Sequence, residues 1–418
     1  MKRFMRLFAI AVLCLGLCAC GAQSDASKLV ELVENQQFDE AHKLLNEMAG
    51  ENAMVWAPKE EGSMEMSPLQ NETSSQVPVT DIPEQPGDYE GVSEITVSNP
   101  QIATAEELLS YSDFKQDVIY EIVADIDLQG KTFPENQGCV YGIIEGNGHT
   151  ISNVQNRALF HSNVGTIRNL NVDVDIHIEN RVNDSSAYVA GLVGYNGGTL
   201  ENCVVKGNIF VACGEMKVGG LTVDSHGTIY RCGNEANITL EGKGINPLGN
   251  EVLIGRGEVG GVAKSSASIA ECYNTGDIIV RECSSVDVGG VVYSQYDVLK
   301  DCYNAGDIMI LDSSYDDYVG GIGYDLSQAQ TSCNFGKVKG GIVSRLMGTY
   351  LVDCYYLKSA SEYGAVTNDD AEDSERIRVY ALSDNEALLQ ENYSKLDFEN
   401  VWIMGEEGYP ILRWQVQE

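Results

Sequence analysis

Positive charge is scarce in this chain of 418 residues. Lys and Arg together number 27 against 62 Asp and Glu, so the formal net charge at pH 7 is −35. A chain with this balance is repelled by the phosphates of nucleic acids and by anionic membrane surfaces. The composition therefore argues against a nucleic-acid partner and favours a solvated protein outside the cytoplasm.

A hydrophobic run long enough to span a bilayer comfortably is also missing. Leu7–Cys20 is apolar but short, and it follows three basic residues, which is the pattern of a secretion signal. The run ends in LCAC (17–20), which resembles the lipobox of bacterial lipoproteins. That resemblance implies removal of residues 1–19 and a lipid on Cys20, which would anchor the chain to the bacterial cell membrane. An ordinary secretion signal is the alternative.

The rest of the chain divides into four segments. Residues 20–49 hold the anchor and show helical periodicity, which predicts a short helical hairpin. Residues 50–93 contain five Pro and no apolar period, which predicts a disordered, flexible linker. Residues 94–356 are rich in Val, Ile, Gly and Asn and predict many short strands. Residues 357–418 are predicted to form a C-terminal cap over the last open edge.

Two capping boxes predict short helices within these segments. Thr104 stands three residues before Glu107, and Ser383 stands three residues before Glu386. The apolar residues of 401–414 then predict terminal strands.

A unit of about 30 residues recurs from residue 188 onward. Each unit has a Gly-rich apolar run, a Cys and, in most units, a later Ile or Val, and CYNTGDI (272–278) is rewritten as CYNAGDI (302–308). The Leu ladder of leucine-rich repeats is absent, and the unit is shorter than a propeller blade. Three apolar runs per unit instead predict an all-β fold, a parallel β-helix solenoid. Its coils would stack about 4.8 Å apart, which brings equivalent residues into rows.

These rows predict the core and one corner of the coil. The Cys row is interpreted as small buried thiols, with disulfides as the alternative and zinc disfavoured because no His joins the row. A Gly row is predicted to have positive φ, and an Asn row is predicted to form an amide ladder. The Cys row is Cys203, Cys232, Cys272, Cys302, Cys333 and Cys354, and the aliphatic row is Ile209, Ile238, Ile278, Ile308 and Val338. The Gly row is Gly207, Gly276, Gly306 and Gly336, and the Asn row is Asn234, Asn274, Asn304 and Asn334.

One of these runs resembles a known motif. GLVG (191–194), followed by an Asn-Gly turn and ENCVVKGNI, is similar to the GLUG repeat of bacterial surface proteins, although later units depart from it at the fourth position. The resemblance implies a right-handed parallel β-helix on a surface lipoprotein. Some relatives are immunoglobulin-A-cleaving zinc peptidases, which need His-Glu-x-x-His. None of the five His has that context, so neither a catalytic residue nor a cofactor is assigned.

Carboxylates are the only groups present in quantity that suit a metal site. Asp277 and Asp307 share one row and would either bind Ca²⁺ or form an exposed turn in which Lys337 relieves the repulsion. Asp312, Asp316 and Asp317 form a second acidic cluster, read as a solvated loop or a weak Ca²⁺ site.

One unit is longer than the others. The surplus around residues 241–258 must leave the stack, either as a tolerated insertion or as a recognition loop on a rigid scaffold. With a recognition loop, the nearby tyrosines would form a glycan- or peptide-binding surface; they are Tyr188, Tyr195, Tyr273, Tyr293, Tyr296, Tyr303, Tyr315 and Tyr318.

Three functions are compatible with these observations. The favoured one is a cell-surface lipoprotein that presents a non-catalytic β-helix for adhesion, binding a host or envelope glycan or protein. The alternatives are a polysaccharide lyase or glycoside hydrolase, and a structural component of the envelope.

Overall fold

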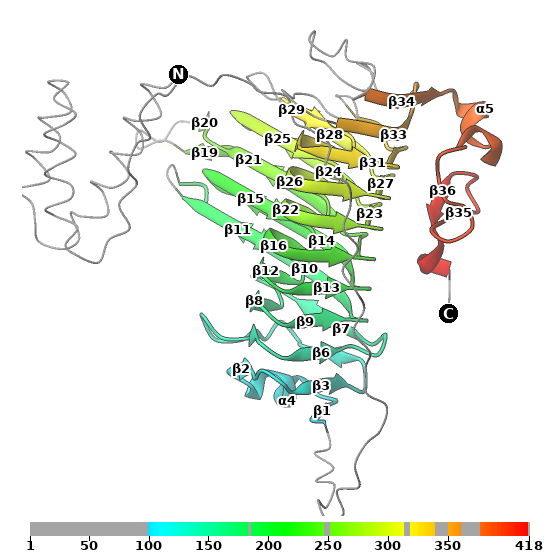
Figure 1. The fold of residues 1–418 in the computed structure, drawn as a ribbon. Coiled ribbons are helices and arrows are strands. Elements are labelled where there is room, and N and C mark those ends of the chain that lie inside the picture. The colour runs from blue at the N-terminus through cyan, green and yellow to red at the C-terminus, as the bar shows by residue number, and fades with distance from the viewer. Residues whose placement is uncertain are drawn as a thin grey trace, which may run out of the picture. The chain divides into compact units, whose positions relative to one another are not determined.

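The computed structural model describes residues 99–182, 185–245, 251–312, 318–338, 350–360 and 377–416. These residues form a parallel β-helix, in which the strands of successive coils stack on one another from β1 to β34 (Figure 1). The predicted all-β solenoid is therefore confirmed. The predicted lipidation site Cys20, the segments 1–19, 20–49 and 50–93, and Asp316 and Asp317 lie outside the described residues.

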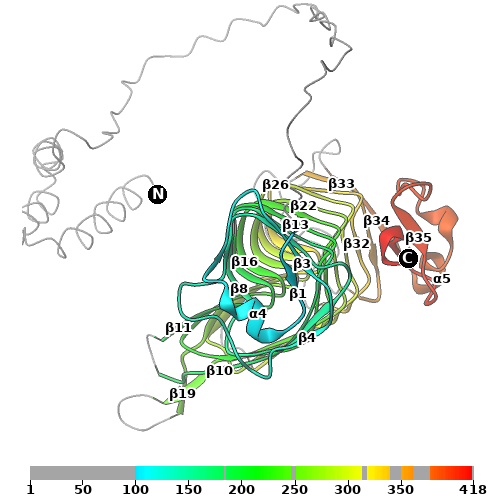
Figure 2. The same cartoon turned by 90° about the horizontal axis from the view of Figure 1, so that it is seen from below.

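The first coils begin with a short helix. Helix α4 (Ala105–Ser110) has the predicted capping box, because Thr104 Oγ1 accepts from Glu107 N and the Glu107 carboxylate accepts from Thr104 N. Leu108 of α4 is fully buried in the main core cluster. Helix α4 lies at the end of the stack formed by the first coils (Figure 2). The strands of the first coils are β1 (Gln101–Ile102), β2 (Asp113–Phe114), β3 (Ile119–Ile122), β4 (Ile126–Asp127), β5 (Cys139–Val140), β6 (Ile143–Glu145), β7 (Thr150–Val154), β8 (Phe160–Asn163) and β9 (Thr166–Arg168).

The later coils have three faces. The first face holds β10 (Asn171–Glu179), β14 (Val204–Ala212), β17 (Gly233–Asn234), β18 (Asn237–Glu241), β23 (Tyr273–Asn274), β24 (Ile278–Arg281), β27 (Tyr303–Asn304), β28 (Ile308–Leu311) and β32 (Cys333–Asn334). The second face holds β11 (Ser186–Ala190), β15 (Glu215–Gly219), β21 (Arg256–Gly260), β25 (Ser285–Gly289) and β29 (Tyr318–Gly320). The third face holds β12 (Val193–Asn196), β13 (Thr199–Glu201), β16 (Thr222–Tyr230), β22 (Ala263–Ala270), β26 (Val292–Lys300), β30 (Gly323–Leu326), β31 (Gln328–Gln330) and the start of β33 (Tyr350–Leu357).

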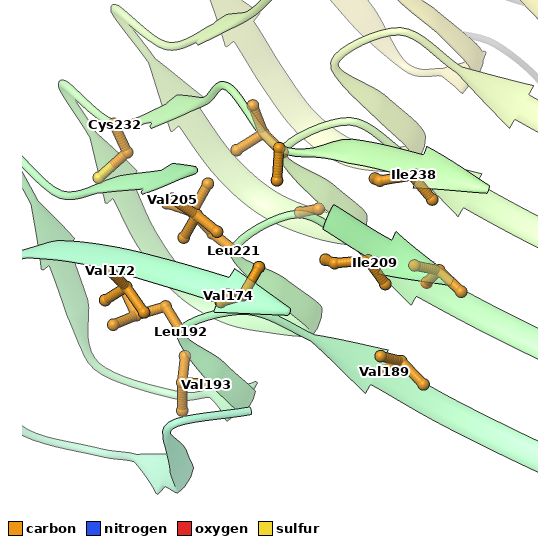
Figure 3. Close-up of a cluster of buried hydrophobic side chains, with 14 of the residues drawn as sticks. Val172, Val174, Val189, Leu192, Val193, Val205, Ile209, Leu221, Cys232 and Ile238 are labelled. Carbon is orange, nitrogen blue, oxygen red and sulfur yellow. The ribbon is translucent and has the colours of Figure 1, made fainter. Parts of the chain in front are cut away.

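The aliphatic row fills the core behind the first face. Ile209, Ile238, Ile278 and Ile308 are register partners in adjacent strands, and each is at most 4% exposed. Val338 belongs to the same buried cluster. Because side chains alternate along a strand, the intervening residues face outward. Figure 3 shows Ile209 and Ile238 among the inward side chains of neighbouring coils.

The Cys row departs from the prediction at one coil. Cys232 N donates to Cys272 Sγ and Cys272 N donates to Cys302 Sγ, both at 3.4 Å. Cys302 N then donates to Ser332 Oγ at 3.1 Å, while Cys333 pairs with Tyr303 in a different row. The assignment of Cys333 to the row is therefore wrong, because Ser332 occupies the position and its Oγ accepts the backbone hydrogen bond that a Cys Sγ accepts in the coils before it. Cys203 begins the row, and Cys354 lies beside Ser332.

The Gly row is explained by close packing rather than by backbone conformation. Of its four members only Gly207 has a positive φ, of 103°, so the prediction is wrong for the other three. A Cβ on Gly276 would lie 2.0 Å from the carbonyl oxygen of Ala236 in the coil before it, so the chain there has no room for a side chain. A row of left-handed residues instead precedes the Cys row; its members are Asn202, Arg231, Glu271, Asp301, Thr331 and Asp353.

In the described part of the C-terminal segment, β34 (Ile377–Leu382) pairs with β33 of the last coil, and the residues after it pack along the side of the coils (Figure 1). Tyr273 and Tyr303 point outward but are only 3% and 2% exposed, because residues 390–416 cover them. The segment contains β34 (Ile377–Leu382), which pairs with β33, then α5 (Asp384–Ala387), the 3₁₀ turns η2 (Gln390–Asn392) and η3 (Arg413–Val416), and the hairpin β35 (Trp402–Met404) and β36 (Pro410–Leu412). None of the helices in the described ranges is long and apolar enough to cross a membrane.

Candidate binding groove

The carboxylates of Asp277 and Asp307, considered above as a metal site, accept hydrogen bonds from the backbone of the next coil. Asp307 N donates to Asp277 Oδ1 at 2.9 Å, and Lys337 N donates to Asp307 Oδ1 at 2.8 Å. One oxygen of each carboxylate is thus used to stack the coils. Asp312 follows β28 in the left-handed region. The described residues contain no group of three or more His, Cys, Asp or Glu that could hold a metal ion.

The outer side of the second face carries a different row of functional side chains. In each of its strands, the residue just before the inward-facing Val points outward. These residues are register partners from coil to coil, and we call them the groove row: Tyr188, Lys217, Glu258, Asp287 and Tyr318. A parallel outward row lies beside it and contains Ser186, Glu215, Arg256 and Ser285.

A groove with a volume of about 810 Å³ lies over the middle three strands of this face. Its floor is formed by β15, β21 and β25, and one side is formed by Leu253 and Ile254 of the long unit. Among its lining residues are the charged side chains Glu215, Lys217, Arg256, Glu258 and Asp287. The insertion predicted from the unit length therefore forms part of the groove.

The inserted segment is a hairpin whose base is fixed to the first face. Strands β19 (Lys243–Ile245) and β20 (Glu251–Leu253) pair antiparallel and project from the corner between the first two faces (Figure 2). Arg181 Nη1 donates to Glu241 Oε1 at 2.8 Å and to the carbonyl oxygen of Lys243 at 2.9 Å. These contacts hold the chain where it leaves the coil.

Lys217 is the second residue of the groove row, next to Tyr188 at the β11 end, and its neighbours hold it in place. Its Nζ lies 3.1 Å from Glu215 Oε1 and 5.1 Å from the centre of the Tyr188 ring. Burial lowers the pKa of Lys217, but the hydrogen bonds with Glu215 and Tyr188 outweigh it and raise the pKa. The ammonium group is therefore a fixed positive charge.

Lys264 neutralises the centre of the row from the third face. Its Nζ lies 3.0 Å from Asp224 Oδ1 and 3.4 Å from Glu258 Oε2, and its side chain is 12% exposed. Burial raises the pKa of Asp224, but hydrogen bonds from Ser265 and Lys264 outweigh it and lower the pKa. The Asp224 carboxylate is thus held in its charged form.

Three tyrosines stack on one another at the β29 end of the groove row, and one of them, Tyr318, belongs to the row. The ring centres of Tyr293 and Tyr324 are 5.6 Å apart, and those of Tyr318 and Tyr324 are 5.1 Å apart, with planes inclined by 17° and 21°. Burial, followed by the charges of Asp287 and Glu258, raises the pKa of Tyr293. Its phenol therefore stays protonated and can donate a hydrogen bond.

Sequence reasoning identified Tyr188, Tyr293 and Tyr318 but missed the charged members of the site. The sequence does contain a signal for them, because each residue of the groove row begins a similar four-residue motif. The five motifs are YVAG, KVGG, EVGG, DVGG and YVGG. Tyr273 and Tyr303 lie under the C-terminal segment, and Tyr195 and Tyr296 are exposed on the third face. Tyr315 lies outside the described residues.

No protein-family model matches this chain, and no curated protein matches it. Solved structures that are similar to this chain include the following two. One is a protein from Bacteroides ovatus, provisionally named an immunoglobulin A1 protease, with 18% identity and a TM-score of 0.43 over 76% of this chain and 94% of that one. The other is named IgA1 protease, with 14% identity and a TM-score of 0.49 over 67% of this chain. This chain spans 23% of that second protein, and both similarities are too low to support shared activity.

Proposed function

We propose that this protein is a lipid-anchored lipoprotein of the bacterial cell surface whose β-helix binds a glycan or protein without catalysis. The observation that carries the proposal is the groove of about 810 Å³ on the second face. Its floor is a parallel sheet backed by a fully buried core, so the groove exists before a ligand arrives. Charged side chains of its lining are held by neighbours, Lys217 by Glu215 and Glu258 by Lys264, which lowers the entropic cost of binding.

The anchor is proposed from the sequence alone. Cys20 ends an apolar segment that resembles a lipobox, and a lipid there would keep the β-helix outside the cytoplasmic membrane. Cys20→Ala is expected to move the chain from the membrane fraction to the soluble fraction. A variant that stays membrane-bound would contradict lipid anchoring through this residue.

A hydrolase is the second candidate because two carboxylates of the groove are neighbours. Glu258 and Asp287 are register partners on adjacent strands, and pairs of carboxylates perform acid–base chemistry on glycosidic bonds. Product release from neutral or uronic-acid polysaccharides, lost in Glu258→Gln, would establish this candidate and overturn the non-catalytic proposal.

Binding is tested with the purified full chain against host glycans, matrix proteins and cell-wall polymers. Tyr188→Ala should weaken whatever binding is found. Tyr296→Ala is the matched control, because Tyr296 is 62% exposed on the third face and Tyr188 is 58% exposed on the second. Binding that responds equally to both substitutions, or no binding to any probe, would contradict the proposal.

A further inference from the structure

We infer that the ligand of the groove is a neutral, extended glycan that lies along the axis of the β-helix with about one sugar unit per coil. The inference rests on the proposed function and specifies its ligand. It follows from the spacing, the chemistry and the charge of the groove row.

The spacing of the groove row favours a polymer whose repeat matches the coil. Neighbouring strands lie about 4.8 Å apart, so the five register partners from Tyr188 to Tyr318 span roughly 19 Å. A sugar ring in an extended glycan has a comparable length, so successive rings meet equivalent positions on successive coils. In an extended peptide, the side chains of one face are about 6.7 Å apart, so their spacing does not match the spacing of about 4.8 Å between coils.

The chemistry of the row suits sugar rings at both ends and hydroxyl groups between them. Tyr188 at the lower end is 58% exposed, and Tyr318 at the upper end stacks with a second tyrosine. Aromatic side chains combine a broad apolar surface with a polar tip, and sugar rings likewise have apolar faces and polar edges. The middle positions hold Lys217, Glu258 and Asp287, which supply both donors and acceptors.

The charges of the groove disfavour an anionic polymer. Lys217 is bonded to Glu215, and Lys264 is shared between Asp224 and Glu258. Among the side chains that line the groove, the carboxylates of Glu215, Glu258 and Asp287 outnumber the cations of Lys217 and Arg256. A polyanion would also meet a chain whose net charge is −35. A neutral glycan avoids this repulsion and can still hydrogen-bond to the polar side chains that line the groove.

The test is calorimetric titration of the purified full chain with neutral β-1,4-linked gluco-, manno- and xylo-oligosaccharides of increasing length. Polygalacturonate serves as the anionic probe. For the neutral series that binds, affinity should rise by roughly tenfold or more from a disaccharide to about five sugars and then level off, because the row ends there. Polygalacturonate should bind at least tenfold more weakly.

Tyr188→Ala separates this geometry from binding at a single point. The variant should lose about tenfold in affinity for the longest oligosaccharides but little for a trisaccharide, because it removes only the lower end of the row. Tyr296→Ala should leave both affinities unchanged. Affinity independent of chain length, a preference for polygalacturonate, or binding of proteins alone would overturn the inference and leave the proposed function standing. No binding to any probe would overturn both.

Discussion

The side-chain amide of Asn274 donates a hydrogen bond to Asn304 Oδ1 at 2.8 Å, and both side chains are completely buried. Asn234 donates to Asn274 in the same way, and Asn304 donates to Asn334. Each of these amides also donates to the carbonyl oxygen two residues further on, so the ladder fixes the turn of every coil as well as the stacking of coils.

Removing the side-chain amide of Asn274 should destabilise the stack of coils. Asn274→Ala deletes both donor bonds of this amide and leaves the Asn234 amide and Asn304 Oδ1 without their partner in the ladder. Each unpaired buried group costs about 1–3 kcal/mol, so the free energy of unfolding should fall by roughly 3 kcal/mol. Denaturant unfolding measures the change. Asn208→Ala, on the exposed row of the first face, is the control and should change stability by less than about 0.5 kcal/mol. Equal effects of the two substitutions would contradict the role of the ladder.

The buried thiols should be unreactive in the folded protein. All nine cysteines of the described residues are free, and eight of them are buried. Burial raises the pKa of Cys272 well above its ordinary value and raises that of Cys354 to about 12, so the reactive thiolate is scarce. An alkylating reagent should therefore modify the half-buried Cys139 first, and Cys272 and Cys354 only in denaturant. Peptide mass spectrometry reads this out, and native labelling of Cys272 would contradict it.

The rows of the core could be predicted because stacking repeats one pocket in every coil. One pocket selects Cys and another selects Ile, and each recurs at intervals of about 30 residues. This repeat was enough to place Ile278 beside Ile308. The pattern failed where the pocket accepts two residue types, since Ser332 and Cys333 are adjacent and similar in size. Counting one 30-residue unit from Cys302, instead of searching for the next Cys, would have identified Ser332.

The groove was less accessible to sequence reasoning because its side chains face solvent, where packing does not select one residue type. Lys217, Glu258 and Asp287 share a position but not a chemistry, so the row shows no repeat of residue type. The covering of Tyr303 was also hidden. Its outward direction follows from strand alternation, but its partner Gln415 is 112 residues away.

The C-terminal segment should depend on one buried tryptophan. Trp402 is fully buried, and its Nε1 donates to Asp301 Oδ1 at 3.3 Å. Trp402→Ala removes a packing contribution of about 3–5 kcal/mol and should release residues 383–416 to a protease while the coils stay intact. Trp402→Phe keeps most of the ring and should be cleaved far more slowly. Equal resistance of the alanine variant and the native chain would contradict this docking.

Asp301 and Asp353 should give stability profiles of opposite sign with pH. Each precedes a cysteine of the Cys row, with φ of 51° and 59° respectively. Burial raises the pKa of Asp301, whereas hydrogen bonds from Arg378, at 3.1 and 2.8 Å, lower the pKa of Asp353. A raised pKa means that the folded state holds the proton more tightly than the unfolded chain, so its contribution is present in acid and lost as pH rises. The lowered pKa of Asp353 contributes stability that is present at neutral pH and lost in acid.

Asparagine substitution at each site tests these signs, because Asn tolerates the left-handed backbone and keeps a hydrogen-bond acceptor. Asp301→Asn should raise the unfolding midpoint at neutral pH, and the gain should shrink as the pH falls toward the ordinary aspartate value of about 4. Asp353→Asn should lower the free energy of unfolding at neutral pH, by at most about 1 kcal/mol because Arg378 is half exposed, and the loss should vanish in acid. Thermal unfolding across this pH range measures both. Because the two positions share their backbone geometry and place in the coil, shifts of the same sign would show that the environments of the two carboxylates do not control their protonation.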